Sequence, residues 1–86
     1  MLAFRTEIRN TPNQQTIKIY LMDVALDKSI KKLLKTLDGV NNIEIQESLA
    51  RNRVEENITI FRKKDVNINE LKSNIDKILN DYFTIS

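Results

Sequence analysis

The amino-terminal part of the chain contains two runs in which apolar and polar residues alternate, the pattern of strands buried on one face. The first run covers Leu2–Ile8 and the second covers Ile17–Met22. Residues 10–15 separate them and include Pro12, whose fixed φ and missing N–H favour a turn. We therefore predict an antiparallel hairpin. The two faces of the second strand carry Ile17, Ile19 and Leu21 on one side and Lys18, Tyr20 and Met22 on the other.

Between Val24 and Leu37 the apolar residues recur with the period of an amphipathic helix. These positions are Leu26, Ile30, Leu33, Leu34 and Leu37. We expect Leu33 or Leu34 to face the sheet. Asp23 or Asp27 can cap the helix at its start. Gly39, the only glycine in the chain, follows at a point where a left-handed residue commonly ends a helix.

The second half of the chain contains another hairpin and another helix. Alternation returns over Val40–Leu49 and Val54–Arg62, and the polar residues between them predict a turn. After the loop Lys63–Asp65, Asn67 precedes Glu70 by three positions, which resembles a helix-capping box. The predicted helix carries its apolar residues at Ile68, Leu71, Ile75, Ile78, Leu79 and Tyr82. We expect residues 83–86 to form a short final strand or a tail.

This order of elements predicts one domain over residues 1–86, an α+β ferredoxin-like sandwich with two helices on one face of an antiparallel sheet. Right-handed crossovers place Ile17–Met22 beside Glu56–Arg62 in the middle of the sheet. The outer neighbour of Ile17–Met22 is normally the last strand, for which residues 83–86 are short. We expect the additional amino-terminal strand, Leu2–Ile8, to occupy this edge of a four-stranded sheet, or to share a five-stranded sheet with the tail.

The absence of cysteine and histidine narrows the chemistry that this chain can perform. It removes disulfides, thiolate and imidazole metal ligands, and catalysis that depends on a histidine. A single glycine cannot form a glycine-rich phosphate loop. Glu55 and Glu56 are adjacent on a predicted strand and would face opposite sides, which makes them a poor acid–base pair. We therefore expect no enzyme activity, no cofactor and no metal site.

The charge of the chain is mildly basic, with a formal net charge of +2 and a pI near 9.0. A dedicated nucleic-acid-binding domain usually has a larger excess of basic residues. The first residues do not combine a basic region with a long apolar run, and no apolar stretch approaches the roughly 18 residues needed to cross a bilayer. We therefore expect a cytoplasmic protein that makes no membrane contact.

The segment Thr16–Ile45 resembles the heavy-metal-associated domain, the fold of copper chaperones. In that family a strand leads into a metal loop with two cysteines separated by two residues, and a helix and a Leu-x-Gly-Val-x-x-Val-x-Val passage follow. Leu37–Ile45 reads Leu-Asp-Gly-Val-Asn-Asn-Ile-Glu-Ile and matches this passage. The resemblance covers roughly residues 16–82 and implies the same fold. The family's two cysteines would correspond to Asp23 and Leu26, so the resemblance implies a degenerate member without a soft-metal site.

Four lysines lie within about 100° of one another on the predicted helix Val24–Leu37. This lysine stripe consists of Lys28, Lys31, Lys32 and Lys35. Such a stripe can meet phosphates, an acidic protein or an anionic membrane. The more ordinary interpretation is the solvated back of an amphipathic helix.

The sheet face opposite the helices is a second candidate surface. Its predicted residues are Lys18, Tyr20, Met22, Glu44, Gln46, Thr59 and Phe61, with Ala3 and Arg5 beside them. Tyr20 and Phe61 lie on the two central strands, where ribonucleoprotein-type sheets carry their base-stacking aromatic residues. Two rings are a small number for such a platform. An open face and an unpaired sheet edge are typical of domains that meet partners or themselves.

We therefore predict a non-enzymatic interaction module that binds a protein partner, or a second copy of itself as a homodimer, through its sheet face or edge. One alternative is nucleic-acid or anion binding through the lysine stripe, with nucleic acid the less favoured partner. Another is a small-ligand sensor similar to the ACT amino-acid-binding domains. Those domains usually have a glycine-containing loop after the first strand, and residues 22–25 contain no glycine.

Overall fold

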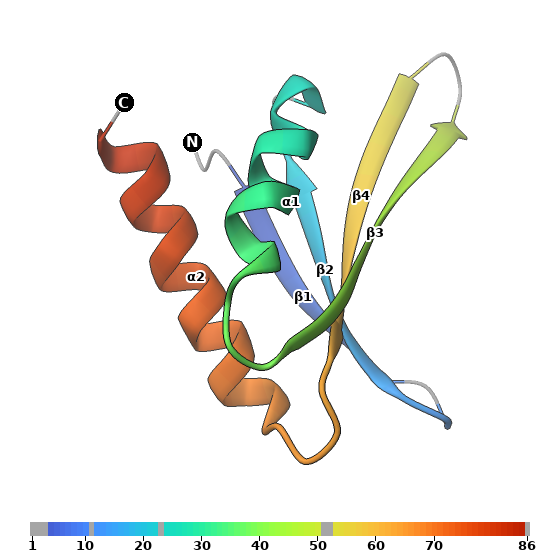
Figure 1. Cartoon of the computed structure of the whole chain (residues 1–86). Helices are drawn as coiled ribbons and strands as arrows, with labels where there is room; N and C mark the ends of the chain where they lie inside the picture. The colour runs from blue at the N-terminus through green and yellow to red at the C-terminus, as the bar shows by residue number, and fades with distance from the viewer. Residues whose placement is uncertain (1–3, 11, 23, 51–52, 86) are drawn as a thin grey trace.

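The computed structural model describes residues 4–10, 12–22, 24–50 and 53–85, and for residues 24, 46–50, 53–57 and 85 it describes the backbone alone. The elements follow one another along the chain in the predicted order (Figure 1). They are β1 (Phe4–Asn10), β2 (Gln15–Leu21), the 3₁₀ turn η1 (Val24–Leu26), α1 (Asp27–Lys35), β3 (Val40–Ala50), β4 (Arg53–Arg62) and α2 (Ile68–Ile85).

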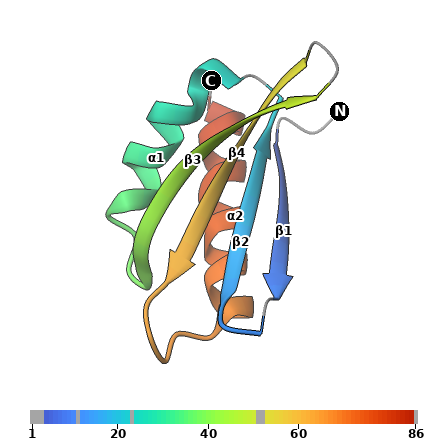
Figure 2. The same ribbon diagram turned by 90° about the vertical axis from the view of Figure 1, so that its right-hand side faces the viewer.

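The four strands form one antiparallel sheet in the order β1-β2-β4-β3, and both helices lie on the same face of it (Figure 2). The predicted ferredoxin-like α+β arrangement is thereby confirmed. The central strands are β2 and β4, as the crossover rule requires, with Ile19 opposite Ile58. β1 lies outside β2, at the edge that the last strand takes in the usual order of this fold.

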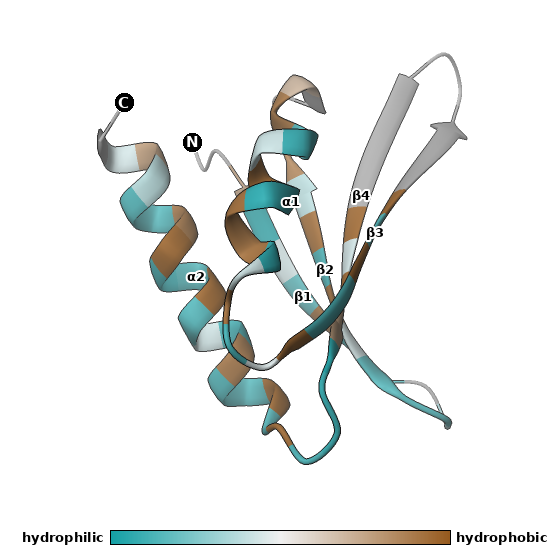
Figure 3. Cartoon of the chain, viewed as in Figure 1, coloured by the Kyte–Doolittle hydropathy of each residue, from teal (hydrophilic) through white to brown (hydrophobic). Residues whose placement is uncertain are grey.

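The core lies between the sheet and the two helices. Apolar residues recur along both helices and along β2, β3 and β4, whereas the loop between β4 and α2 is hydrophilic (Figure 3). One row of isoleucines crosses all four strands in register, consisting of Ile8, Ile17, Ile60 and Ile43. The helices cover the sheet with fully buried residues, which are Ile30 and Leu34 from α1 and Leu71, Ile75 and Leu79 from α2. Of the two candidate leucines on α1, Leu34 faces the core and Leu33 is 36% exposed.

The helix ends show which predicted caps form. Asn67 caps α2, because its side-chain oxygen accepts hydrogen bonds from the N–H groups of Asn69 (2.9 Å) and Glu70 (3.2 Å). α1 is different: its N-cap position is Leu26, which makes no side-chain cap hydrogen bond. The prediction of Asp27 as the cap is wrong, since a preceding 3₁₀ turn moves Asp27 into the first helical turn, where it accepts from the N–H of Lys28 (2.5 Å). Asp23 lies outside the described residues.

Gly39 does not end α1 as predicted, because the helix ends at Lys35 with Thr36 as its C-cap. It lies instead in the following turn, which the hydrogen bond from the N–H of Val40 to the Leu37 carbonyl closes (3.2 Å), and it has a left-handed φ of +95°. A β-carbon at this position would lie 3.3 Å from a methyl group of Val66. The Gly39 carbonyl also accepts a hydrogen bond from the N–H of Lys63 (2.8 Å). The position therefore needs glycine both for its backbone angle and for the close approach of the β4–α2 loop.

The prediction that residues 83–86 form a strand or a tail is wrong for residues 83–85, because α2 continues through them as a helix. Residue 86 lies outside the described residues. Phe83 stacks on Phe4 of β1 with ring centroids 5.7 Å apart and meets Tyr82 edge-on at 5.1 Å. The Thr84 hydroxyl donates to the Asn80 carbonyl (2.6 Å), as in a continuing helix. The apolar side chain at position 83 thus covers β1 instead of pairing with it as a strand, and the described sheet has four strands.

A polar contact also fixes β1 against α2. The Thr6 hydroxyl donates to one carboxylate oxygen of Asp76 (2.5 Å), and the other oxygen pairs with the Lys72 ammonium (2.8 Å). These side chains are partly buried, so the bonds are less exposed to competing water than surface bonds are. Together with the Phe4–Phe83 stack, they hold the amino-terminal strand in its edge position.

Candidate functional site

The lysine stripe occupies the side of α1 that faces away from the core. Lys28, Lys32 and Lys35 are exposed, and Lys31 is half-buried. Ile30 and Leu34 on the opposite side of the same helix are fully buried. None of the four lysine ammonium groups pairs with a carboxylate within the part of the chain that the structure describes. The stripe is therefore a run of four positive charges without an ion-pair partner among the described residues.

Two of these lysines line a hollow between α1 and the edge strand β3. This α1–β3 hollow has a volume of about 140 Å³ and is lined by Lys31, Lys35, Val40, Asn41, Asn42 and Ile43. Its lining contains two ammonium groups and two side-chain amides, and no carboxylate. Figure 2 shows α1 lying alongside β3 at this end of the sheet. The hollow therefore combines positive charge with a strip of strand backbone.

The outer edge of β3 has no neighbouring strand among the described residues. β3 is 11 residues long, and its pairing with β4 shifts by one residue between Val40 and Asn42. Asn41 is the extra residue of this bulge and has no partner across the ladder. An unpaired strand edge presents backbone N–H and C=O groups that can pair with another extended segment.

The β3–β4 hairpin also extends past the rest of the sheet (Figure 1). β2 pairs with β4 only from Tyr20 opposite Asn57 to Thr16 opposite Phe61. β3 and β4 remain paired beyond that point, as far as Ala50 opposite Arg53. The far end is a two-stranded ribbon, an arrangement that is marginally stable in water by itself.

The open sheet face carries Tyr20 and Phe61, as predicted, but the two rings do not form a joint platform. Tyr20 lies opposite Asn57, and Phe61 lies opposite Thr16. They are thus four residues apart along the strands, about 13 Å. The guanidinium carbon of Arg5 also lies 4.4 Å from the centre of the Tyr20 ring, which occupies one face of that ring.

The residues around the two rings on this face are mostly charged, and several of them are exposed. The Arg9 guanidinium donates to the Tyr20 hydroxyl (3.4 Å) and pairs with the Glu7 carboxylate (3.0 Å), and these contacts raise the pKa of Arg9, the hydrogen bond more than the carboxylate. Thr59, which we expected on an exposed face, is only 4% exposed, and its hydroxyl has no hydrogen-bond partner among the described residues. Its neighbours across the ladders are Lys18 and Glu44, whose long side chains flank a short one in the middle of the sheet. Ala3 and the side chain of Gln46 lie outside the described residues.

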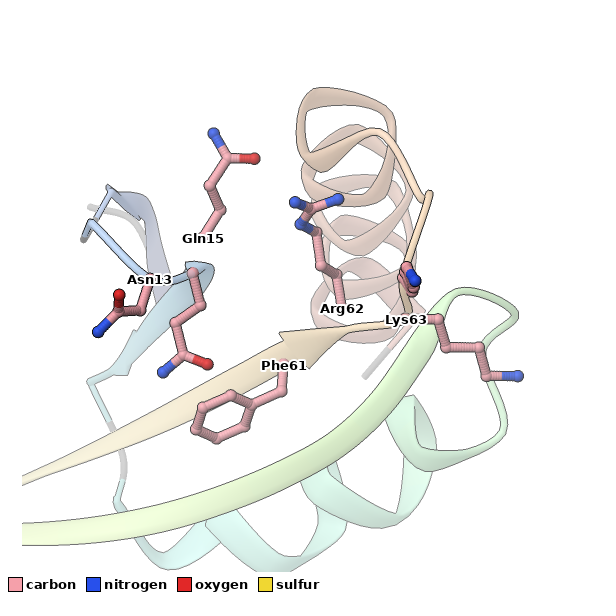
Figure 4. Close-up of a pocket in the computed structure, with 7 residues that line it drawn as sticks. Asn13, Gln15, Phe61, Arg62 and Lys63 are labelled. Atoms are coloured by element: carbon pink, nitrogen blue, oxygen red, sulfur yellow. The ribbon is translucent and has the colours of Figure 1, made fainter.

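A further pocket of about 240 Å³ lies where β2 begins and β4 ends (Figure 4). It is lined by Asn13, Gln14, Gln15, Phe61, Arg62, Lys63 and Lys64. Two of its polar groups already have internal partners. The Arg62 guanidinium donates to the Val66 carbonyl (2.6 Å), and the Gln15 amide donates to the Asn10 side chain (2.9 Å). In Figure 4 the Phe61 ring and the Arg62 guanidinium point to opposite sides of the strand, so they do not converge on one ligand.

The described residues contain no group of three or more histidine, cysteine, aspartate or glutamate side chains able to hold a metal ion. Leu26, which the resemblance to the heavy-metal-associated domain aligns with one of the family's cysteines, is half-buried and packs against the core. No described helix has both the length and the apolar character that crossing a membrane requires.

Sequence reasoning could identify the lysine stripe, because the stripe depends only on helical periodicity. It could not place Lys31 and Lys35 beside the free edge of β3, since that depends on how α1 packs on the sheet. The bulge at Asn41 gave no signal in the sequence either.

Comparison of the chain with protein-family models, curated proteins and solved structures found no match.

Proposed function

We propose that this protein is a non-enzymatic interaction module that binds a partner protein by adding one of its extended segments to the free edge of β3. The observation that carries the proposal is this edge, which has no described neighbour and runs beside the α1–β3 hollow. Strand addition supplies affinity through backbone hydrogen bonds, and neighbouring side chains supply specificity.

The edge is a better interaction surface than the open face. The open face is dominated by charged residues and internal contacts, such as those of Arg5 and Arg9 with Tyr20. An interface centre normally needs apolar or aromatic residues that can be desolvated together. The two rings on this face are separated along the strands, and one of them is already covered by an arginine.

A foreign partner is favoured over a second copy of the chain. If two β3 edges paired about a two-fold axis, the two copies of α1 would approach across the interface. Their lysine stripes would then bring like charges together, which opposes association.

We also propose that the chain is related to the heavy-metal-associated domain in its fold and that it does not carry metal ions. Nucleic-acid binding stays the alternative, supported by the four lysines of the stripe, which pair with no carboxylate in the described part of the chain.

The proposal is tested by blocking the edge without disturbing the existing sheet. Asn41→Pro removes a backbone N–H of the edge strand at a bulge residue that no β4 residue lies directly opposite, a position where sheets tolerate proline. Asn41→Ala is the matched control, because it removes the same side chain and keeps the N–H. Both variants should unfold at temperatures close to that of the wild type.

The protein should capture a partner from lysate of its source through β3. We expect wild type and Asn41→Ala to retain the partner and Asn41→Pro to lose it. Amide hydrogen exchange in the complex should slow along β3 and stay unchanged along β1, the other sheet edge. Equal capture by all three proteins, with exchange slowed on the open face instead, would contradict edge binding.

A further inference from the structure

Resting on the proposed function, we infer that the segment that pairs with β3 is an acidic stretch with carboxylates at alternate positions, which Lys31 and Lys35 bind. The class of partner is thus an extended peptide segment in which every second residue is aspartate or glutamate. The inference follows from the charge of the α1–β3 hollow, from its spacing and from its polar lining.

The charge of the hollow favours an anionic occupant. Its lining holds the ammonium groups of Lys31 and Lys35 and no carboxylate. Neither ammonium group is paired with an acid elsewhere in the described part of the chain. The nearest acidic residue along β3 is Glu44, which lies in the row of Thr59 and so on the sheet face away from α1. A carboxylate that enters the hollow therefore meets two cations and no acidic residue in the lining.

The spacing of the two lysines matches that of a strand. Lys31 and Lys35 are separated by four residues of helix, a rise of about 6 Å along α1. Side chains on one face of a strand recur every second residue, at about 6.6 to 6.8 Å. Figure 2 shows α1 next to β3. A segment paired with the outer edge of β3 can therefore present alternate side chains to Lys31 and Lys35. Two charge-assisted hydrogen bonds can form without bending the peptide.

The lining of the hollow favours a peptide over a nucleic acid. The edge of β3 offers backbone donors and acceptors in alternation, and only another peptide backbone satisfies both. The amides of Asn41 and Asn42 add further donors and acceptors beside this edge. A phosphate backbone would use the lysines but would leave the edge groups without partners.

The inference is tested with three synthetic peptides of about ten residues that alternate threonine with glutamate, glutamine or lysine. Binding is measured at low salt by NMR chemical-shift titration of the labelled protein. We expect the glutamate peptide to shift the amides of β3 and to bind about tenfold more tightly, or better, than its isosteric glutamine counterpart. The lysine peptide should not bind. Added salt should weaken the glutamate complex.

Charge-reversed variants assign the effect to the two lysines of the hollow. The variant K31E/K35E should lose the glutamate peptide and gain the lysine peptide. The control K28E/K32E reverses two lysines of the same stripe that do not line the hollow, so its net charge changes equally. It should keep most of the binding. The neutral variant K31Q/K35Q replaces the first variant if charge reversal disturbs the spectrum of the free protein.

Four outcomes would overturn the inference. Equal binding of the glutamine peptide along β3 would remove the acidic preference and leave edge binding intact. Equal loss in K28E/K32E would show that the attraction is diffuse. A thymidine oligonucleotide that displaces the glutamate peptide and depends on the same two lysines would assign the hollow to nucleic acid. Failure of all three peptides to bind would exclude this class of partner, whereas the Asn41→Pro and Asn41→Ala pair judges the proposed function separately.

Discussion

Leu34 and Leu33 are adjacent on α1, and truncating each to alanine should have very different effects. Leu34 is fully buried in the core cluster, whereas 36% of Leu33 remains exposed to solvent. Loss of a fully buried leucine side chain costs about 2.7 to 5 kcal/mol, because the apolar atoms lose their burial and a cavity is left behind. The same truncation at a partly exposed position that leaves no closed cavity should cost about 1 kcal/mol.

The size of the domain makes this difference easy to measure. At about 0.05 to 0.15 kcal/mol per residue, a chain of 86 residues has a total stability of about 4 to 13 kcal/mol. For a domain of this length, each kcal/mol lowers Tm by about 4 to 8 °C. Leu34→Ala should therefore lower Tm by at least about 10 °C, and Leu33→Ala by less than about 8 °C.

Thermal unfolding followed by circular dichroism, with urea unfolding as a second measurement, would test this pair. The urea m-values should stay equal, since the surface exposed on unfolding is almost unchanged. If Leu34→Ala does not fold, Leu34→Met supplies a milder change that should cost less than about 1.5 kcal/mol. Equal shifts for the two alanine variants, or a larger one at Leu33, would refute the packing of α1 described above.

Three further predictions concern other parts of the molecule. Gly39→Ala should destabilise the fold by about 1 to 2 kcal/mol in urea unfolding, because φ is +95° and the new methyl group meets Val66; an unchanged midpoint would mean that this junction relaxes freely. Asp76→Ala should cost about 1 to 3 kcal/mol and speed amide exchange in β1 more than in β3, because the Thr6 hydroxyl loses its acceptor; uniform acceleration would argue against a local role. The wild-type protein should bind duplex DNA weakly or not at all, and replacing all four lysines of the stripe by glutamine should leave the fold intact. A submicromolar complex of the wild type, with a slope of log K against log salt of about −3 to −4, that is lost in the glutamine variant would instead favour nucleic-acid binding.

The order and type of the main elements could be predicted because the apolar residues of each element recur with a clear period, and because turn or capping residues separate most of the elements. Asn67 caps α2 as the sequence suggests, whereas Gly39 adopts its left-handed conformation in the turn before β3 and not at the end of α1. The end of α2 could not be predicted, because four residues are too few to tell a period of two from one of 3.6. Phe83 fits either pattern, and its contact with Phe4, 79 positions earlier in the chain, decides in favour of the helix.

The candidate site also has one part that the sequence could predict and another that it could not. The lysine stripe follows from helical geometry within nine residues, so the sequence contains all that is needed to locate it. The α1–β3 hollow brings together a helix face, a strand edge and a bulge, and its position depends on tertiary packing. The burial of Thr59 is also a tertiary effect. Alternation along β4 predicts its face correctly but does not show that its neighbours cover it.

The position of β1 has a consequence for how the chain assembles during synthesis. β1 is synthesised before the other described elements, and its partners on α2 are synthesised after them, so the bond from Thr6 to Asp76 spans 70 residues. At about 5 to 20 residues per second, the β1–β2 hairpin waits about 3 to 13 s before α2 is complete. Throughout that interval Ile17 and Ile19 have no helix from α2 to cover them, and a nascent chain in this state is open to capture by chaperones or to association with its neighbours on the same messenger RNA.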